Sequence, residues 1–323
     1  MITSLLLGNK SFPVNIIQGP LAGISCAPFR LLTWRYGQPA FSCTEMISCK
    51  TILHQPTLAA ERFMRKDPAE GPVCFQLAGN DPVELAEAVK RVTDYGADLI
   101  DLNCGCPVKK IRQKGAGSRL LMDPVRLYQL IRAMKQNTSV PVSIKIRVEG
   151  HGQEKFNHDI AQVVSDAGAD FLVVHGRHWT EHYETPCHHE DIQFFVENLK
   201  IPVIGNGDIA CRASLQKMLN TGCAGVMIAR SGVWQPWLIQ QLIAEMRQEA
   251  FVAPSLAARA AIYLEHVQGL IMLLGSEKFA LLQARNFAKY YARELPQKAA
   301  FVLAMQCCET LQEMSAICTR YFE

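Results

Sequence analysis

The sequence predicts an α/β protein in which a closed (β/α)8 barrel is followed by an all-helical domain. Three observations carry this prediction. Eight short apolar runs alternate with amphipathic, helix-like stretches through the first 250 residues. No Gly-x-Gly-x-x-Gly turn follows an early run, which counts against the alternative of an open, doubly wound sheet. Beyond Ala253 and Pro254 the pattern is helical only.

Each apolar run has the length of a buried strand, and the alternation with helices implies parallel strands joined by crossover helices. The expected strands cover residues 14–18, 40–46, 73–77, 97–103, 142–147, 171–175, 203–206 and 225–229. Two of the helices have a clear start, because Asp81-Pro82 and Asp123-Pro124 each supply an N-cap carboxylate and a first-turn proline. We therefore expect a barrel domain over residues 1–250 and a helical domain over residues 251–323.

Composition narrows the class of protein. With 323 residues and 49% hydrophobic side chains, the chain can form one large domain and a smaller one. Its net charge of +3 excludes a polycation, so that any contact with nucleic acid must come from local patches. The 12 cysteines are scattered, which is typical of reduced thiols and not of a disulfide framework. Because we find neither signal-peptide features nor a membrane-length apolar run, we expect a cytoplasmic protein.

Polar side chains stand at the carboxyl ends of the expected strands, where barrel enzymes keep their active sites. Gln76 can donate to and accept from a flat polar heterocycle, and Lys145 would stabilise negative charge on such a ring. The loops after the last two strands, which carry Gly207 and Arg230, form the usual phosphate site of these barrels. Flavin mononucleotide (FMN) has both the ring and the phosphate that these residues suit.

The loop after the fourth strand carries Cys106 between Gly105 and Pro107, followed by the basic pair Lys109-Lys110. A thiol at a strand end without a Cys-x-x-Cys partner favours proton or covalent chemistry over a disulfide. A packed loop thiol is the alternative interpretation. The adjacent basic pair indicates an anionic partner.

The helical domain carries a basic stripe. If the segment is one helix, side chains four residues apart share a face, and a side chain seven residues away lies on that face too. The stripe consists of Lys278, Arg285, Lys289 and Arg293, with Phe287, Tyr290 and Tyr291 between them. Such a stripe can follow the phosphates of RNA, and a solvated helix face is the alternative.

The chain resembles the tRNA-dihydrouridine synthase family. The shared motifs lie at residues 19–24, 28–30, 44–46, 75–82, 101–107, 117–118, 145–147, 175–177, 206–209 and 227–230. Each motif alone is weak, whereas their joint order and spacing are specific. The segment 117–118 and the C-terminal end look closer to the bacterial B type, and residues 103–106 look closer to the C type. We lean to the B type and leave open which uridine is reduced.

The resemblance implies how the residues divide their roles. NADPH would reduce FMN, the hydride would pass to C6 of a tRNA uridine, and Cys106 would give the proton to C5. The residues implied to contact FMN are Pro20, Leu21, Ala22, Gln76, Lys145, His175, Asn206, Gly207, Asp208, Ala229 and Arg230. Asn103 and Arg177 would lie at the substrate or flavin, and the basic stripe would contact tRNA. The target uridine would have to leave the folded tRNA to react.

Two motifs depart from the family. Residues 19–21 read Gly-Pro-Leu where the family commonly has Ala-Pro-Met, and His178 stands where threonine is common. In the His-rich segment 175–189, His178 and His182 have the four-residue spacing of metal ligands on a helix, but the segment is typical of a polar loop, and we expect no metal.

Two rival functions stay open at this point. One is a flavin enzyme that acts on a free pyrimidine, and the other is a tRNA chaperone whose barrel has lost its catalytic activity. We expect a monomer.

Overall fold

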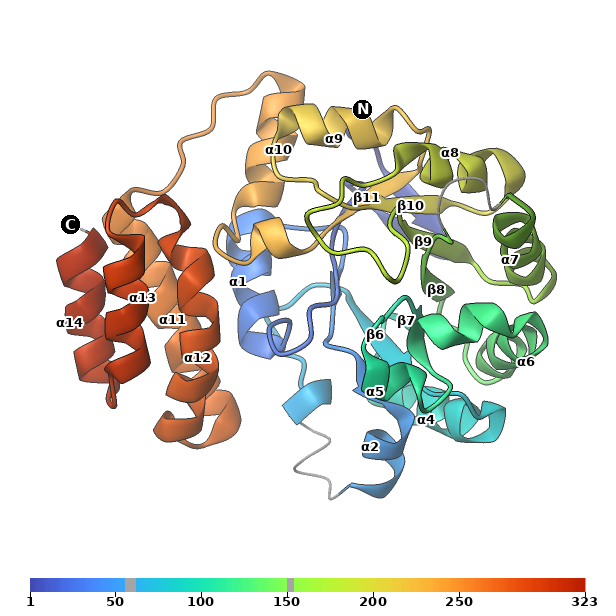
Figure 1. Ribbon diagram of the computed structural model, residues 1–323, viewed down its shortest axis with the longest axis horizontal. Helices are drawn as coiled ribbons and strands as arrows, with labels where there is room; N and C mark the ends of the chain where they lie inside the picture. Colours follow the sequence, from blue (N-terminus) through green and yellow to red (C-terminus); the bar gives the residue numbers. More distant parts are fainter. Residues whose placement is uncertain (56–61, 150–153, 323) are drawn as a thin grey trace.

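A computed structural model describes residues 1–55, 62–149 and 154–322. Its centre is a ring of parallel strands (Figure 1). The ring consists of β3 (Ile16–Gln18), β4 (Ser42–Cys43), β6 (Val73–Ala78), β7 (Leu99–Cys104), β8 (Val142–Arg147), β9 (Phe171–His175), β10 (Val203–Asn206) and β11 (Gly225–Ile228). Because β11 pairs with β3, β3 with β4, and β4 with β6, the sheet closes. The predicted (β/α)8 barrel is confirmed.

Two features differ from the sequence-based expectation. Of the second expected strand, 40–46, only β4 forms, and a short additional strand, β5 (Ile47–Ser48), follows that range and pairs with the end of β6. The first residues form an unexpected antiparallel hairpin of β1 (Leu5–Leu7) and β2 (Lys10–Phe12). These two strands are short and no helix separates them, so the alternation of strand and helix that indicated the barrel strands gave no signal for them.

Helices surround the barrel, and two begin where the sequence predicts. The Asp81 side chain accepts from the backbone N–H groups of Val83 and Glu84, and Asp123 accepts from that of Arg126. The helices of this part are α1 (Ala27–Gly37), α2 (Cys49–His54), α4 (Pro82–Asp94), α5 (Lys109–Arg112), α6 (Pro124–Lys135), α7 (Glu154–Asp166), α8 (His189–Asn198), α9 (Arg212–Leu219) and α10 (Leu238–Arg247), with 3-10 turns η1 (Gly117–Met122) and η2 (Arg230–Gly232).

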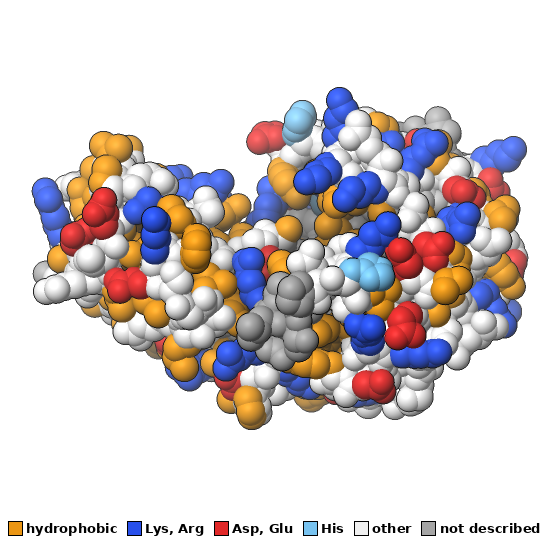
Figure 2. Space-filling model, turned by 90° about the horizontal axis from the view of Figure 1, so that it is seen from below, with side chains coloured by type: hydrophobic (Ala, Val, Ile, Leu, Met, Phe, Trp, Pro, Cys, Tyr) orange, Lys and Arg blue, Asp and Glu red, His pale blue; other side chains and the backbone are white. Residues whose placement is uncertain are grey.

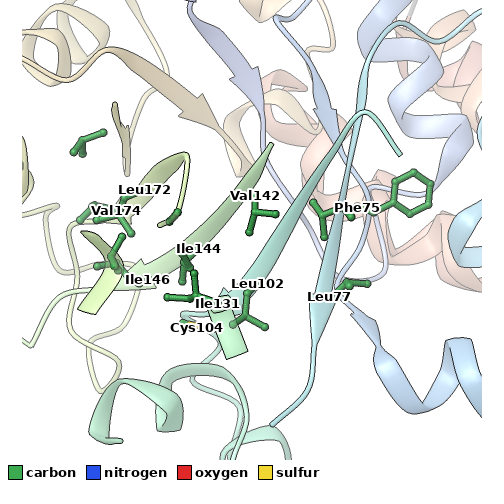
Figure 3. Packing of buried hydrophobic residues seen from close by; sticks show 14 of the residues in the cluster. Phe75, Leu77, Leu102, Cys104, Ile131, Val142, Ile144, Ile146, Leu172 and Val174 are labelled. Carbon is green, nitrogen blue, oxygen red and sulfur yellow. The ribbon is translucent and has the colours of Figure 1, made fainter. Parts of the chain in front are cut away.

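Strand alternation separates the core from the site. Figure 3 shows Leu102 of β7 and Ile144 of β8 beside Ile131 of α6, in the cluster between the barrel and its helices. Since successive side chains of a strand point to opposite faces, the residues between these apolar ones point into the barrel. At the amino-terminal end that interior is apolar, with Phe41 and Phe171 in a cluster that includes the hairpin's Phe12. Towards the carboxyl ends of the strands it becomes polar.

The helical domain lies at one side of the barrel, against α1 (Figure 1). It consists of α11 (Leu256–Leu274), α12 (Glu277–Tyr291), the turn η3 (Ala292–Glu294), α13 (Lys298–Cys307) and α14 (Leu311–Phe322). A Cβ on Gly269 of α11 would come within 2.8 Å of the Pro28 side chain, so that close packing there requires a glycine. None of the helices in the described ranges combines the length and apolar character that crossing a bilayer needs.

Candidate functional site

A pocket of about 370 Å3 opens at the carboxyl ends of β8 to β11. The predicted flavin-binding residues that line it are Pro20, Leu21, Lys145, His175, Asn206, Gly207, Asp208, Ala229 and Arg230. Two further predicted residues do not line it: Ala22 is exposed, and Gln76 is buried in β6. The pocket is also lined by Tyr183, which the sequence did not suggest, and by Tyr290, which the sequence placed beside the basic stripe.

The deep end of the pocket holds a lysine, an amide and an imidazole. Lys145 Nζ donates to Asn206 Oδ1 at 2.9 Å, and Asn206 Nδ2 donates to the Met227 carbonyl at 2.8 Å. Desolvation and the neighbouring Arg147 lower the pKa of Lys145 to about 8, so that it is still mostly charged at neutral pH. A charged lysine beside a fixed amide suits the polar edge of a planar ring.

His175 is a neutral imidazole at this end. Burial, followed by the nearby cations of which Lys145 is the strongest, holds the pKa of His175 well below its usual value. The Arg177 guanidinium lies 3.1 Å from His175 Nε2. Since a guanidinium only donates, Nε2 must be the accepting nitrogen and the proton must lie on Nδ1. His175 therefore presents a defined tautomer.

The other end of the pocket is formed by a tight backbone turn and arginine side chains. Gly207 has φ 139° and Asp208 has φ 51°, so that the chain turns sharply after β10. A Cβ on Gly207 would come within 2.5 Å of Cys187 Sγ, which leaves glycine as the residue that fits. Asp208 accepts from Arg177 and from Arg230, the latter at 3.4 Å.

Cations from both domains line this end of the pocket, which we call the cationic end. The Arg230 guanidinium lies 3.7 Å from the centre of the Tyr183 ring. Arg293 of η3 and Tyr290 of α12 bring the helical domain into the same pocket. Two guanidinium groups and a glycine turn stand at one end, with Lys145 and a polar amide at the other, so that the pocket could hold a ligand with an anionic group and a planar polar ring.

Cys106 lies in the loop after β7, one strand away from Lys145. Asn103 of β7 is the register partner of Lys145 on β8, which places the Cys106 loop beside the deep end. The Cys106 side chain is half-buried, whereas Cys104 is buried, belongs to the outer core cluster and has a pKa raised well above its usual value by desolvation. The geometry therefore separates an accessible thiol from a core thiol two residues earlier.

Arg177 anchors the His-rich loop over the pocket. It is fully buried and donates to the carbonyls of Tyr183, at 3.1 Å, and Thr185, at 2.6 Å. His178 and His188 of this loop lie near carboxylates, with His188 Nε2 at 2.9 Å from Glu181 Oε1. Within the described ranges, no three His, Cys, Asp or Glu side chains are close enough to hold a metal ion.

The predicted basic stripe is only partly one surface. Lys278 and Lys289 are exposed on α12, but the Arg285 guanidinium turns inward to donate to the Cys308 carbonyl. Arg293 lies beyond the helix in η3, because the chain leaves the helical path before Pro296. Figure 2 shows lysine and arginine side chains on both sides of the hollow between the helical domain and the barrel.

Several side chains of the barrel interior and of the pocket wall had no role assigned from the sequence. Asp101, Ser143 and Arg147 alternate with core residues along β7 and β8, and this two-residue periodicity was the signal that would have found them. Tyr183, and the place of Tyr290 in this pocket, carry no such signal, because a loop and a helix from distant parts of the chain bring them there.

The chain matches one protein family over nearly its whole length. A family model described as "Dihydrouridine synthase (Dus)" matches residues 17–322. The chain is 34% identical over 298 residues to "Probable tRNA-dihydrouridine synthase 1" of Synechocystis sp., covering 92% of this chain and 83% of that protein. It is 32% identical over 320 residues to "tRNA-dihydrouridine synthase B" of Vibrio cholerae, covering 98% of both chains. The B-type protein of Xanthomonas axonopodis pv. citri is also 32% identical, over 98% of this chain and 95% of that protein.

Solved structures agree with the fold. A morphinone reductase mutant in complex with tetrahydroNAD superposes with a TM-score of 0.57 at 11% identity, covering 79% of this chain and 93% of that chain. A DHODH from Eimeria tenella in complex with ferulenol gives a TM-score of 0.57 at 14% identity, covering 75% of this chain and 83% of that chain. At these identities the likeness is one of architecture. The match over nearly the whole length is the decisive finding, and the chain belongs to the dihydrouridine synthase family, with a lean to its bacterial B type.

Proposed function

We propose that the protein is a tRNA-dihydrouridine synthase that reduces the C5–C6 bond of a D-loop uridine with FMN and NADPH. The observation that carries the proposal is the arrangement of one pocket. It joins Lys145, His175 and Asn206 to the cation Arg230, and it lies one strand away from the accessible thiol of Cys106. The relatives named tRNA-dihydrouridine synthase support the same reaction.

The pocket suits FMN in its two halves. We propose that Lys145 and Asn206, already linked at 2.9 Å, hold the polar edge of the ring with Gln76 and His175 nearby. The backbone turn at Gly207 and Asp208, with Ala229 and Arg230, would hold the phosphate. Pro20 and Leu21 line the remaining wall. Ala22 is the weakest of these assignments, because its side chain is exposed away from the lining.

The reaction needs a hydride and a proton at adjacent carbons of the uracil. When bound, FMN would supply the hydride chemistry, with NADPH as the reductant. The Cys106 thiol would act as the general acid and give its proton to C5. The ammonium group of Lys145 would stabilise negative charge on the flavin ring. Asn103 and Arg177 would orient the uracil base or the flavin ring.

The two domains would share the work of holding tRNA. We propose that residues 1–250 form the catalytic domain and that residues 251–323 form the tRNA-binding domain. Lys278 and Lys289 are exposed on α12, and Arg293 reaches the pocket wall. Arg285, whose guanidinium is bonded to the Cys308 carbonyl, would contribute less to an RNA surface than the sequence suggests. The hollow between the domains, flanked by cations, is the place where an extruded uridine would enter (Figure 2).

The proposal includes a cytoplasmic monomer. All 12 cysteines are free, and most are buried, which suits a reducing compartment.

The test is an anaerobic titration of the purified protein followed by its absorbance spectrum. We expect a flavin spectrum that bleaches when NADPH is added and returns when unmodified tRNA is added, with dihydrouridine in the product. Fully modified tRNA is the matched control and should not restore the spectrum. Restoration by free uracil or orotate instead of tRNA would favour a free-pyrimidine enzyme, and a protein without flavin would contradict the proposal.

A further inference from the structure

A buried carboxylate without an assigned role lies on β7, the strand that leads into the Cys106 loop. Asp101 of β7 is 4% exposed and points into the barrel. Its Oδ1 accepts from Ser143 Oγ at 2.6 Å, and its Oδ2 accepts from Gln76 Nε2 at 2.8 Å. Burial raises the pKa of Asp101 to about 6, partly offset by these two donors, so that the group is mostly ionised at neutral pH. An ionised carboxylate only accepts hydrogen bonds.

The chain of hydrogen bonds continues from this carboxylate to the backbone of Cys106. Gln76 Oε1 accepts from Asn103 Nδ2 at 2.8 Å. Asn103 Oδ1 in turn accepts from the backbone N–H of Cys106 at 2.9 Å and from that of Gly105 at 3.3 Å. Every donor in the series points towards Asp101. We call this series, from Cys106 N through Asn103 and Gln76 to Asp101, the amide relay.

The two ends of the amide relay fix its direction. A side-chain amide has a donating and an accepting end, and nothing in a lone amide decides which way it faces. Here the far end is a carboxylate that cannot donate, and the near end is a backbone N–H that cannot accept. If Gln76 were turned over, its oxygen would face the oxygen of Asp101. If Asn103 were turned over, its nitrogen would face the N–H of Cys106.

We propose that Asp101 is a positioning residue that acts through Gln76 and Asn103 to hold the Cys106 loop in the geometry for proton donation. This inference rests on the function proposed above and adds a residue to it. Asp101 touches neither the substrate nor the cofactor in this scheme. Its contribution is to supply the only kind of partner, an acceptor, that keeps both amides in one orientation.

Three variants test the amide relay. Asp101→Leu removes the acceptor and keeps a side chain of similar size. Asp101→Asn keeps one acceptor oxygen for Gln76, provided that Ser143 accepts from the new amide, and so serves as the conservative rescue. Ser143→Ala is the matched control, because it removes the other hydrogen bond to Asp101 and leaves the amide relay intact. Each is studied as flavin-loaded protein, in separate reduction by NADPH and reoxidation by tRNA.

The expected result is a selective loss of the second half-reaction. Reoxidation by tRNA should slow about a hundredfold in Asp101→Leu, which is the cost of an ångström-scale misplacement of a reacting group. It should slow about tenfold in Asp101→Asn, corresponding to one weakened hydrogen bond, and less than about twofold in Ser143→Ala. Reduction by NADPH should change by less than about threefold in all three variants. A residue that only stabilised the fold would change the amount of folded holoenzyme and leave both rates per flavin alone.

A second readout does not depend on tRNA. The alkylation rate of Cys106 by iodoacetamide, followed by mass spectrometry of its peptide, should rise several-fold in Asp101→Leu as the loop loosens, with the exposed Cys307 as internal reference. Wild-type reoxidation and unchanged alkylation in Asp101→Leu would overturn the proposal. Should that variant not fold, equal rates in Asp101→Asn and Ser143→Ala would overturn it. If wild-type protein fails to respond to tRNA while the alkylation rates still differ, the proposed function is wrong and the amide relay stands.

Discussion

The two ends of the barrel interior are built from the same strands and have opposite characters. On β6, Cys74 points into an apolar cluster, and Gln76, two residues later, enters the amide relay. On β9, Phe171 belongs to that cluster and His175 lines the pocket. The amino-terminal end is closed by the β1–β2 hairpin, whereas the carboxyl-terminal end is open and cationic. Stability and chemistry are thus divided along each strand, and the two can be changed separately.

The largest effect is expected at the open end, from Cys106→Ala. Loss of a general acid should slow reoxidation by tRNA about 10²- to 10⁴-fold, and reduction by NADPH should be unchanged because the thiol is not needed for it. Stopped-flow spectroscopy of both half-reactions measures this. Cys104→Ala is the control, since that thiol belongs to the outer core, and its rates per flavin should match the wild type. Undiminished modification by Cys106→Ala would refute the acid assignment.

The closed end should show the opposite result. Phe12 is 3% exposed, and its ring centre lies 5.3 Å from that of Phe41. Phe12→Ala should lower the free energy of unfolding by about 3–5 kcal/mol, through lost burial and the cavity left behind. Chemical denaturation measures this loss, while the half-reaction rates per bound flavin stay unchanged. Leu6→Ala on the exposed side of the hairpin, where Leu6 is 63% exposed, should cost less than about 0.5 kcal/mol. A rate defect in Phe12→Ala would show that the two ends are coupled.

An effect of intermediate size is expected at the cationic end of the pocket. Arg230→Ala should weaken FMN binding by about 1.5–3 kcal/mol, the contribution of a charge-assisted hydrogen bond. Fluorescence titration of the apoprotein with FMN measures the dissociation constant. Arg212→Ala changes an exposed arginine on α9 that lies outside the pocket lining, and its dissociation constant should equal that of the wild type. Equal affinities of the two variants would argue against a phosphate at Arg230.

The lowered pKa of Lys145 predicts a pH effect at the deep end. The folded pKa, about 8, lies below the ordinary value, so that the ammonium of the apoprotein is lost as pH rises through 8. If the charged form binds FMN, affinity should be full below pH 8 and about tenfold weaker at pH 9. The same titration carried out from pH 7 to pH 9 tests this. Lys145→Met should bind weakly with no such step, and an unchanged step in that variant would assign the titration to another group.

The smallest effect is expected outside the barrel. Lys289→Ala removes one exposed cation of α12, and the salt dependence of tRNA binding should lose about one unit of slope on a double-logarithmic plot. Lys200→Ala is the control, because Lys200 is exposed just before β10, at the closed end of the barrel. Filter binding over a range of salt concentrations measures both. Equal slopes for the two variants would move the tRNA contact away from α12.

The same division explains what could be predicted from the sequence. The strands β8, β9 and β10 have the predicted bounds, because each is a run of apolar residues buried on the outer face and bounded by turn residues. The carboxyl ends of those strands follow from the same pattern, which is why Lys145, His175 and Asn206 were found together. The hairpin was missed, since its two short strands follow one another without the intervening helix that marks a barrel unit.

By itself, the sequence determined the barrel, the two capped helices and the strand-end residues, because periodicity and capping are local properties that neighbouring residues encode. Only the tertiary structure decided which partners those residues meet. Arg285 turns to the Cys308 carbonyl, Arg293 reaches the pocket, and Asp101 ends a series of hydrogen bonds that starts at Cys106. Most of these contacts join residues that are far apart in the sequence, some of them on neighbouring strands. Their geometry therefore depends on how the whole chain packs.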